Sequence, residues 1–128
     1  MIGHVDADCF YVSAERVRFP HLEGLPVGVI GNHGACIIAK SYEAKGAGIK
    51  TGTPIWEGRA LCPDAVYLKR DFRWYETLSR RMLEIVKEVS PRVEFYSIDE
   101  SFYEVDQIDP VGLQTAIMER VGVPVSVG

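Results

Sequence analysis

The stretch "VEFYSIDESFYEV", residues 93–105, decides the fold. Two β-prone runs, 93–98 and 101–105, flank the pair Asp99-Glu100, and this pattern predicts two antiparallel strands joined by a tight turn. A parallel sheet would need single strands that alternate with helices, and that alternation is broken here. The two carboxylates would then stand at the tip of a hairpin.

The segment before this hairpin is the clearest helix in the sequence. Apolar side chains recur at three- and four-residue steps over residues 72–89, with charged residues off that stripe. Asp71 is the expected N-cap, and Ser90-Pro91 is expected to end the helix. The stripe that we expect to face the core consists of Tyr75, Leu78, Met82, Ile85 and Val89.

The remaining segments complete an order of strand, helix, strand, strand, helix and strand. We predict a strand over 2–8, a helix from Asp109-Pro110 to Gly122, and a last strand over 123–127. This order predicts an α+β, ferredoxin-like (βαββαβ) fold. Because the first and third strands of such a sheet are central neighbours, their register decides whether the hairpin tip reaches the first strand.

Residues 12–70 form a long insertion between the first strand and its helix. It is expected to contain most of a helix over 10–18, and two strands over 26–31 and 35–40 joined by the turn Gly31-Asn32-His33-Gly34. Insertions of this length usually carry a function of their own.

The composition is that of one globular domain. The 128 residues are 47% hydrophobic, and 14 basic against 18 acidic side chains give a net charge of −4. A chain that gripped nucleic acid by its overall charge would be basic, so any contact with a polyanion must be local or helped by metal ions. Cys9, Cys36 and Cys62 form no CxxC pair, which argues against a disulfide framework and a zinc site. No signal-peptide core or membrane-length apolar run is visible, and we expect a soluble, cytoplasmic protein without a membrane partner.

A second acidic motif, "HVDADCFYVSAE", lies at residues 4–15. On a strand, Asp6 and Asp8 would share one face. Each motif alone has an ordinary explanation, with Asp8 as a helix cap and Asp99-Glu100 as a solvated turn. Together they favour a shared cation, because neighbouring carboxylates repel one another. Hard oxygen ligands without a cysteine or histidine cluster indicate Mg²⁺, and two such ions can hold the attacking and leaving oxygens of a phosphoryl transfer.

The insertion offers positive charge to a phosphate ligand. A short helix is expected after Ser41, followed by a run rich in glycine and lysine, "AKGAGIKTGTP" (44–54), whose glycines let a backbone come close. Lysines in loops are usually only solvated, but beside a metal-bound triphosphate they become candidate ligands for its outer charges. The candidates are Lys40, Lys45 and Lys50, with Tyr42 in the same segment.

Four segments resemble, in order, the Y-family translesion DNA polymerases of the DNA polymerase IV and polymerase V catalytic-subunit type. They are "DADCFYVSAE" (6–15), "IIAKSYEAKGAGIKTGTPIWE" (37–57), "SPRVEFYSIDESF" (90–102) and "VPVSVG" (123–128). The resemblance covers the whole chain, and the co-occurrence of the first and third segments makes it specific. It implies a palm, residues 1–11 and 71–128, and a fingers portion, residues 12–70, of a low-fidelity enzyme that adds dNTPs to a primer 3′ end during DNA repair.

The resemblance also implies roles at the metal site. Asp6 and Asp99 would be shared by two Mg²⁺ ions, for which Mn²⁺ can substitute. Glu100 would lie beside the primer-end ion, and the main-chain carbonyl of Ala7 would complete the nucleotide-side ion. Asp8 would support the metal site without being one of its main ligands.

On the nucleotide side, the resemblance implies further residues. Cys9 and Phe10 would offer backbone N–H groups to the triphosphate, and Tyr42 and Lys45 would reach its outer phosphates. Tyr11 falls on the steric-gate position, where a ring under the sugar leaves no room for a 2′-hydroxyl.

Two positions depart from the polymerase IV pattern. Lys45 replaces a common arginine, which turns a bidentate phosphate contact into a point charge. Ala39 stands where a hydroxyl is frequent. "IAKS", "EAK" and "GIK" favour the polymerase V branch, whereas Tyr42 and "PIWEG" favour polymerase IV, so the motifs leave the branch open.

The family continues after "VPVSVG" into a lysine-bearing palm segment, a thumb and a little-finger domain, and a sliding clamp would bind these later regions. We therefore expect this chain alone to be unable to polymerise DNA, with primer–template DNA and dNTP as partners of the complete enzyme. One face of the predicted sheet has no helix to cover it. This supports the same expectation, because a parallel or mixed sheet without a covering helix leaves an apolar face exposed.

Three alternatives remain on the residues alone. A phosphatase that forms an aspartyl-phosphate would use Asp6 and Asp8, but Phe10-Tyr11 fit poorly where a hydroxyl or small β-branched residue is needed. A receiver domain would require regular βα alternation, which the paired strands around Asp99 break. A polymerase-like accessory protein without activity would be expected to lose the metal acids, which are all intact here.

Overall fold

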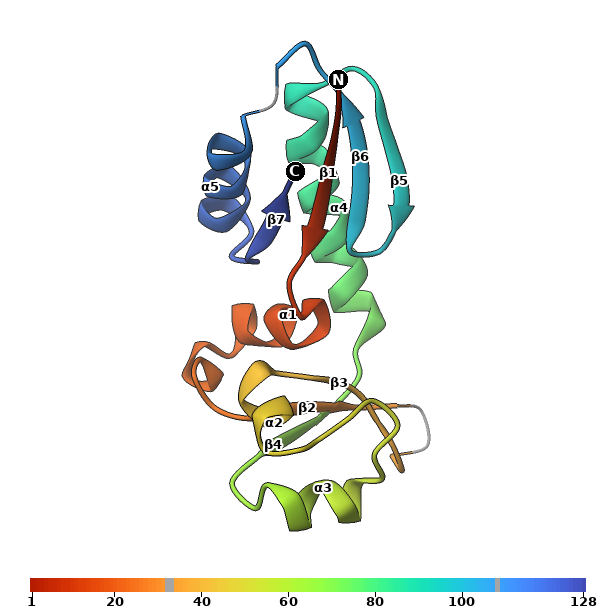
Figure 1. Ribbon diagram of the computed structural model, residues 1–128, viewed down its shortest axis with the longest axis vertical. Coiled ribbons are helices and arrows are strands. Elements are labelled where there is room, and N and C mark those ends of the chain that lie inside the picture. Colours follow the sequence, from red (N-terminus) through yellow and green to blue (C-terminus); the bar gives the residue numbers. More distant parts are fainter. Residues whose placement is uncertain (32–33, 108) are drawn as a thin grey trace.

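Two small sheets make up the fold, and the helix α1 lies between them (Figure 1). The computed structural model describes residues 1–31, 34–107 and 109–128. The four-stranded sheet has the order β5-β6-β1-β7 and the three-stranded sheet the order β3-β2-β4. Along the chain the elements are β1 (Ile2–Ala7), α1 (Phe10–Arg18), η1 (Pro20–Leu22), β2 (Val27–Ile30), β3 (Ile37–Lys40), α2 (Tyr42–Gly46), α3 (Ile55–Leu61), β4 (Val66–Lys69), α4 (Phe72–Val89), β5 (Val93–Ser97), β6 (Glu100–Glu104), α5 (Pro110–Arg120) and β7 (Val125–Val127).

The four-stranded sheet confirms the ferredoxin-like order expected from the sequence. β1 and β6 are its central strands, and every pairing in it is antiparallel. On β1, the buried side chains of Val5 and Ala7 alternate with the half-buried ones of His4 and Asp6. One face therefore joins the core under α4 and α5, and the other stays open to solvent (Figure 1).

This antiparallel pairing changes one conclusion. The parallel or mixed sheet assumed above is wrong, and because an antiparallel sheet can keep one face in water, the open face is no longer an argument about the rest of the enzyme.

The predicted helices are confirmed, together with their caps. α1 and α4 have the predicted bounds. Asp71 accepts from the N–H of Trp74 at the start of α4, and Asp109 accepts from the N–H of Gly112 at the start of α5. Both aspartates satisfy helix N–H groups that would otherwise lack an acceptor.

Several predicted ends are wrong by one or two residues. β1 ends at Ala7 rather than at residue 8, α5 ends at Arg120, and β7 begins only at Val125. Gly122, with a φ of 86°, lets the chain reverse between α5 and β7. On α4 the predicted core positions are buried except Val89, which is 49% exposed because it is the last helical residue.

The second sheet is formed by the 12–70 segment. β2 pairs antiparallel with β3 and parallel with β4. The predicted strands over 26–31 and 35–40 are confirmed as β2 and β3, and the predicted turn Gly31-Asn32-His33-Gly34 includes two residues outside the described part of the chain. The boundary expected after residue 11 falls within the first turn of α1.

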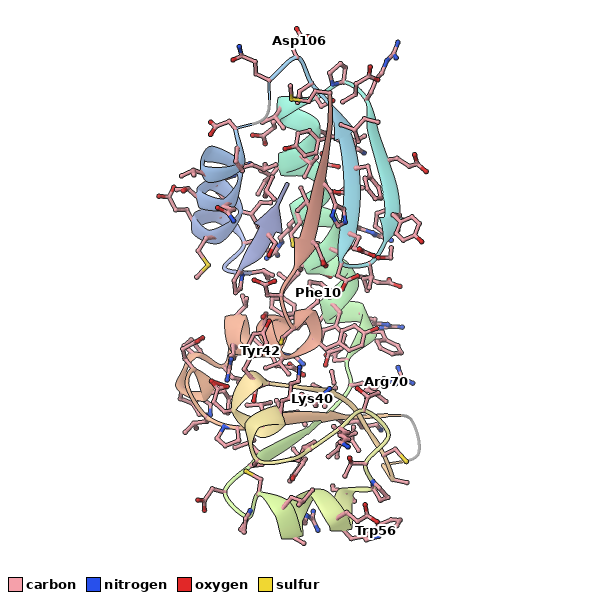
Figure 2. The ribbon with its side chains drawn as sticks, viewed as in Figure 1. Phe10, Lys40, Tyr42, Trp56, Arg70 and Asp106 are labelled. Atoms are coloured by element: carbon pink, nitrogen blue, oxygen red, sulfur yellow. The ribbon has the colours of Figure 1, made fainter. Side chains whose placement is uncertain are left out.

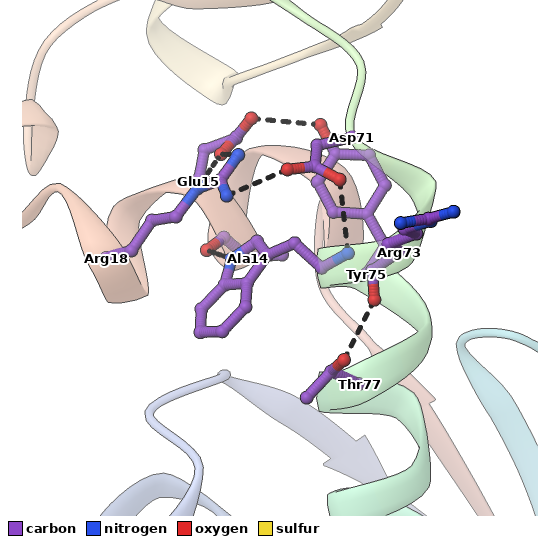
Figure 3. A network of polar contacts seen from close by, with 8 residues as sticks. Ala14, Glu15, Arg18, Asp71, Arg73, Tyr75 and Thr77 are labelled. Atoms are coloured by element: carbon purple, nitrogen blue, oxygen red, sulfur yellow. Dashed lines mark hydrogen bonds and ion pairs between the residues drawn. The ribbon is translucent and has the colours of Figure 1, made fainter.

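α1 and α4 are joined by a network of polar contacts (Figure 3). Glu15, only 1% exposed, accepts from Arg18 Nε at 2.7 Å and from the Tyr75 hydroxyl at 3.1 Å. Arg18 also donates to Asp71 at 2.9 Å, and the Trp74 indole N–H donates to a main-chain carbonyl of α1 at 2.6 Å. The buried carboxylate therefore has the partners that burial requires.

Candidate functional site

The two acidic motifs meet at one end of the four-stranded sheet. Asp6, near the end of β1, is the register partner of Glu100 on β6. The N–H of Ala7 donates to the Asp99 carbonyl at 2.9 Å. All three acids are half-buried. The register thus brings the hairpin tip beside Asp6, as the shared-cation hypothesis requires.

Two serines hold the turn that carries Asp99 and leads into Glu100, the first residue of β6. Ser97 Oγ lies 2.9 Å from Asp99 Oδ1 and 3.3 Å from Glu100 Oε2, so one hydroxyl proton serves two carboxylates. Ser79 Oγ, on α4, donates to the carbonyl of Ile98. The turn is therefore anchored to the helix beneath the sheet, and the two acids are drawn toward the same hydroxyl.

His4 is a further neighbour of these acids. Its Nε2 lies 3.2 Å from Glu100 Oε1, and its ring stacks on Phe102 with the centroids 4.7 Å and the planes 22° apart. Neither His4 nor Ser97 is among the site residues predicted from the sequence. The alternation of side chains along a strand was an available signal, because it puts His4 on the same face as Asp6.

The charges of the site act most clearly on Asp6. Partial burial raises its pKa, and the negative charges of Asp99 and then Glu100 raise it further. His4 opposes this shift, and Asp8 adds a small contribution in the same direction as the other acids. The carboxylates therefore lie close enough to repel one another, and a cation would relieve that repulsion.

The donor chemistry fits a divalent cation of the magnesium type. The three carboxylates and the Ala7 carbonyl are hard oxygen ligands, which Mg²⁺ and Mn²⁺ prefer. Within the described residues, no group of three or more histidine, cysteine or acidic side chains is already gathered around a common point. Ser97 and His4 hold the carboxylates of residues 99–100 in place by hydrogen bonds, and each carboxylate oxygen keeps a further lone pair for a cation.

Asp8 ties the end of β1 to two neighbouring elements. Its N–H donates to the Pro124 carbonyl at 2.9 Å, and its Oδ1 accepts from Ser126 Oγ at 3.2 Å. Its main-chain carbonyl accepts from Ser13 Oγ at 2.6 Å. The N-cap position of α1 is occupied by Cys9, so the explanation of Asp8 as the helix cap is wrong.

The chain turns sharply between β1 and α1. Cys9 has a φ of 43°, in the left-handed region that non-glycine residues rarely adopt. Its side chain makes no capping hydrogen bond to the helix that follows. The Phe10 side chain is buried in the core. The first N–H groups of α1 thus lie directly after the acidic motif without a side-chain cap.

Tyr11 belongs to an aromatic cluster that connects α1 with α4. Its ring stacks on Tyr75, with centroids 4.7 Å and planes 17° apart. Phe72 and Phe10 pack against it at tilted angles, with centroid distances of 5.6 Å and 6.1 Å. The ring is half-buried, so its neighbours fix it while part of its surface stays open, which a rigid wall of a ligand site requires.

Tyr42 begins α2 on the side of the second sheet that faces α1 (Figure 2). Its side chain is 66% exposed. Cys9, and after it the Asp8 carboxylate, raise the pKa of the Tyr42 hydroxyl. Ser41 fixes the start of α2 by accepting from the N–H of Ala44.

The three predicted lysines differ in their surroundings. Lys45, one turn after Tyr42 on α2, and Lys50 are exposed. Lys40 is half-buried and donates to Thr51 Oγ1 at 3.1 Å. Tyr42 thus lies on the side of the second sheet that faces α1, and Lys45 is open to solvent on the same helix.

A ferredoxin-like sheet with acids at the adjacent ends of its central strands, joined to a smaller mixed sheet, is the arrangement of the palm-and-fingers region of polymerases, as the solved structures below show. The chain belongs to the impB/mucB/samB family, which it matches over residues 5–128. The resemblance to Y-family translesion DNA polymerases is thereby confirmed.

Individual proteins show the same similarity. The chain is 37% identical to DNA polymerase IV of Oceanobacillus iheyensis over an alignment 139 positions long, which covers 100% of this chain and 33% of that protein. It is 39% identical over 136 residues to DNA polymerase IV of Pelotomaculum thermopropionicum, covering 96% and 34% of the two chains. Of the two branches that the motifs leave open, these relatives favour polymerase IV.

Solved structures agree over nearly the whole chain. DinB from Sulfolobus solfataricus has a TM-score of 0.88 and 26% identity, and the match covers 99% of this chain and 41% of that one. An insertion ternary complex of Dbh DNA polymerase has a TM-score of 0.89 and 26% identity over the same shares. The chain spans about a third of the length of the curated relatives described above.

No helix within the described residues is long and apolar enough to cross a membrane.

Proposed function

We propose that this chain is the catalytic palm-and-fingers portion of a low-fidelity translesion DNA polymerase, which transfers a nucleotide from a dNTP to a primer 3′ end. One observation carries the proposal: the acids of two motifs far apart in the sequence, at Asp6 and at residues 99–100, stand side by side at the end of the central strands. Residues 1–11 and 71–128 form the palm, and residues 12–70 form the fingers.

The acids hold two Mg²⁺ ions, for which Mn²⁺ substitutes. Asp6 and Asp99 are shared by both ions, Glu100 binds at the primer end, and the Ala7 carbonyl binds at the nucleotide. When bound, such a pair of ions activates the primer hydroxyl and stabilises charge on the leaving phosphates. Partial burial and then the repulsion from the neighbouring acids raise the pKa of Asp6, and this repulsion supports the assignment. Asp8 supports the site by tying β1 to its neighbours.

The nucleotide lies over the start of α1. The N–H groups of Cys9 and Phe10 bind its triphosphate, and the left-handed turn at Cys9 without a capping side chain supports this role. Tyr42 and Lys45 contact the outer phosphates from the fingers. Tyr11 excludes ribonucleotides, because its stacking on an α4 tyrosine keeps the ring from moving aside.

Primer–template DNA binds to the complete protein. A net charge of −4 gives this portion little electrostatic affinity for DNA, because phosphate contacts dominate such binding. A misplacement of about 1 Å between reacting groups lowers a rate by about 100-fold, so this chain alone is not expected to extend a primer. A sliding clamp as partner of the other regions, and a cytoplasmic, nucleoid-associated location, belong to the same proposal.

The test uses a chimera in which this chain replaces the corresponding third of a DNA polymerase IV relative. Asp6→Ala and Asp99→Ala are each expected to abolish primer extension, because a ligand shared by both ions is lost. Asp106→Ala is the matched control, since Asp106 lies at the far end of the palm (Figure 2). Near-normal extension by either of the first two variants would show that the two-metal assignment is wrong.

A further inference from the structure

The open face of the palm sheet carries an ordered ring pair that the proposed chemistry does not use. His4 on β1 and Phe102 on β6 are register partners. Their rings stack with the centroids 4.7 Å and the planes 22° apart. Tyr96 packs edge-on against Phe102, with the centroids 5.8 Å and the planes 83° apart. The His4 ring is thus restrained by an aromatic support although it lies on a solvent-facing surface.

This restrained ring directs one nitrogen at an acid of the site. His4 Nε2 lies 3.2 Å from Glu100 Oε1, and Ser97 Oγ lies 3.3 Å from the other oxygen, Oε2. Each oxygen of the carboxylate therefore faces a donor, and the Ser97 proton is shared with Asp99. The side chain of Glu100 is 29% exposed, so a rotation into solvent is open to it.

Repulsion favours that rotation. Glu100 stands beside Asp6 and next to Asp99, and the like charges of these groups act on one another across the site. Without donors on its two oxygens, the Glu100 carboxylate would move away from the other acids. The hydrogen bond from His4 opposes this movement, because hydrogen bonds to charged acceptors are stronger than those between neutral groups.

We propose that His4 is a positioning residue: stacked on Phe102, it donates from Nε2 to Glu100 and keeps that carboxylate beside Asp6, where the primer-end cation binds. The identity of the cation rests on the proposed function, but the positioning is a property of the folded chain itself. Partners of this kind, which hold a ligand without touching the metal, typically change metal affinity by about 10- to 100-fold when removed.

Three variants separate the ring from the hydrogen bond. His4→Phe keeps a flat ring for Phe102 and removes the donor. His4→Gln supplies an amide N–H at a similar reach without the aromatic stacking. His4→Leu has neither. Circular dichroism and thermal unfolding of each variant check that the chain is folded.

The first measurement needs no metal. NMR couplings between the Hα and Hβ protons of Glu100 report whether its side chain keeps one χ1 rotamer in the 128-residue chain. We expect one dominant rotamer in the wild type, averaging in His4→Phe and His4→Leu, and partial recovery in His4→Gln. Equal averaging in the wild type and in His4→Phe would overturn the positioning role.

The second measurement is titration of the chain with Mn²⁺ alone, with free Mn²⁺ followed by EPR. Binding that is lost in Asp6→Ala defines the site. His4→Phe is expected to weaken it about tenfold, which corresponds to about 1.4 kcal/mol, and His4→Gln by less than about threefold. Equal affinity of His4→Phe and the wild type would overturn the inference and leave the proposed function intact. If the wild type shows no binding that depends on Asp6, the metal site itself is wrong, and the part of the inference that concerns the cation falls with it.

Discussion

Two groups of carboxylates in this molecule have opposite surroundings. Glu15, at the junction of α1 and α4, is 1% exposed and accepts from both Arg18 and Tyr75 (Figure 3). Asp6, at the end of the palm sheet, is half-buried, and the acids of residues 99–100 are the strongest charges acting on it. The Glu15 carboxylate has donors on both of its oxygens, whereas among the described residues no positive group of comparable strength acts on Asp6.

The pKa shifts of two aspartates express this difference. The hydrogen bond from Arg18 lowers the pKa of Asp71, and the backbone N–H of Trp74 lowers it further. Partial burial and like charges raise the pKa of Asp6. Ionised Asp71 therefore stabilises the fold, while ionised Asp6 destabilises it. Such a local conflict is expected at a functional site, where a ligand supplies what the chain leaves out.

The largest effect is expected from removing Glu15, the buried acid at the junction of α1 and α4. Glu15→Ala is expected to lower the free energy of unfolding by about 3 kcal/mol, because it leaves Arg18 and the Tyr75 hydroxyl without their shared acceptor. Urea unfolding of the chain measures the change. Glu84→Ala is the control, since Glu84 is exposed and its contact with Lys87 is 3.7 Å long, and it should shift stability by less than about 0.5 kcal/mol. A loss below about 1 kcal/mol for Glu15→Ala would show that the junction is not a stabilising network.

Tyr11 is connected to the junction of α1 and α4, because its stacking partner Tyr75 donates to Glu15. In the polymerase chimera, Tyr11→Ala is expected to raise ribonucleotide use relative to deoxynucleotide use by a factor on the order of 100, since the ring no longer fills the space of a 2′-hydroxyl. Tyr11→Phe retains the ring and should retain the discrimination. Competition between the two nucleotide types in primer extension gives the ratio, and an equal loss of both would assign Tyr11 to packing alone.

Asp71 offers a smaller and pH-dependent test. Asp71→Ala removes both the cap of α4 and the contact with Arg18, and is expected to lower the free energy of unfolding by about 1 kcal/mol at pH 7. Because the folded chain lowers the pKa of Asp71, this stability is present above the ordinary value of about 3.9 and is lost as the pH falls through the lowered value. Thermal unfolding from pH 7 to pH 3 measures the difference. Asp71→Asn keeps a capping oxygen and should fall between the alanine variant and the wild type.

The sequence predicts the elements that carry their own local signals. Apolar periodicity marks α4 over 72–89, and Asp71 and Asp109 mark two helix starts by their ability to accept from backbone N–H groups. α3 was not predicted, because Trp56 and Leu61 on this helix are exposed and no apolar stripe runs along it. β4 has four residues, too few for a reliable alternation pattern.

The candidate site, like the fold, could be predicted only in part from the sequence. Asp6 and the 99–100 pair could be predicted because acids in an apolar, β-prone context are unusual. The register that joins them, the bond from His4 to Glu100 and the shared hydroxyl of Ser97 depend on how strands pair across many intervening residues. Local patterns contain no information on that pairing, so these contacts could be read only from the folded chain.

The smallest expected effect is a gain in stability, opposite in sign to the loss expected for Asp71→Ala. Asp6→Asn is expected to raise the free energy of unfolding by about 0.5 kcal/mol at pH 7, because it removes a charge that the other acids repel. The folded pKa of Asp6 is raised, so the folded chain binds a proton more tightly than the unfolded chain in the window above the ordinary value of about 3.9. Wild-type stability therefore falls as the pH rises through this window, and the advantage of Asp6→Asn disappears below it.

Thermal unfolding of the wild type, Asp6→Asn and Asp106→Asn between pH 3 and pH 7 measures this effect, and the last variant controls for the loss of one negative charge far from the site. Mn²⁺ should then reverse the order, because a ligand that binds only the folded state stabilises the wild type and leaves the Asn variant unchanged. A gain that does not depend on pH, or a destabilised Asp6→Asn at pH 7, would contradict the repulsion between the site acids. Stabilisation of both chains by Mn²⁺ to the same degree would place the cation elsewhere, since Asp6 would then not be one of its ligands.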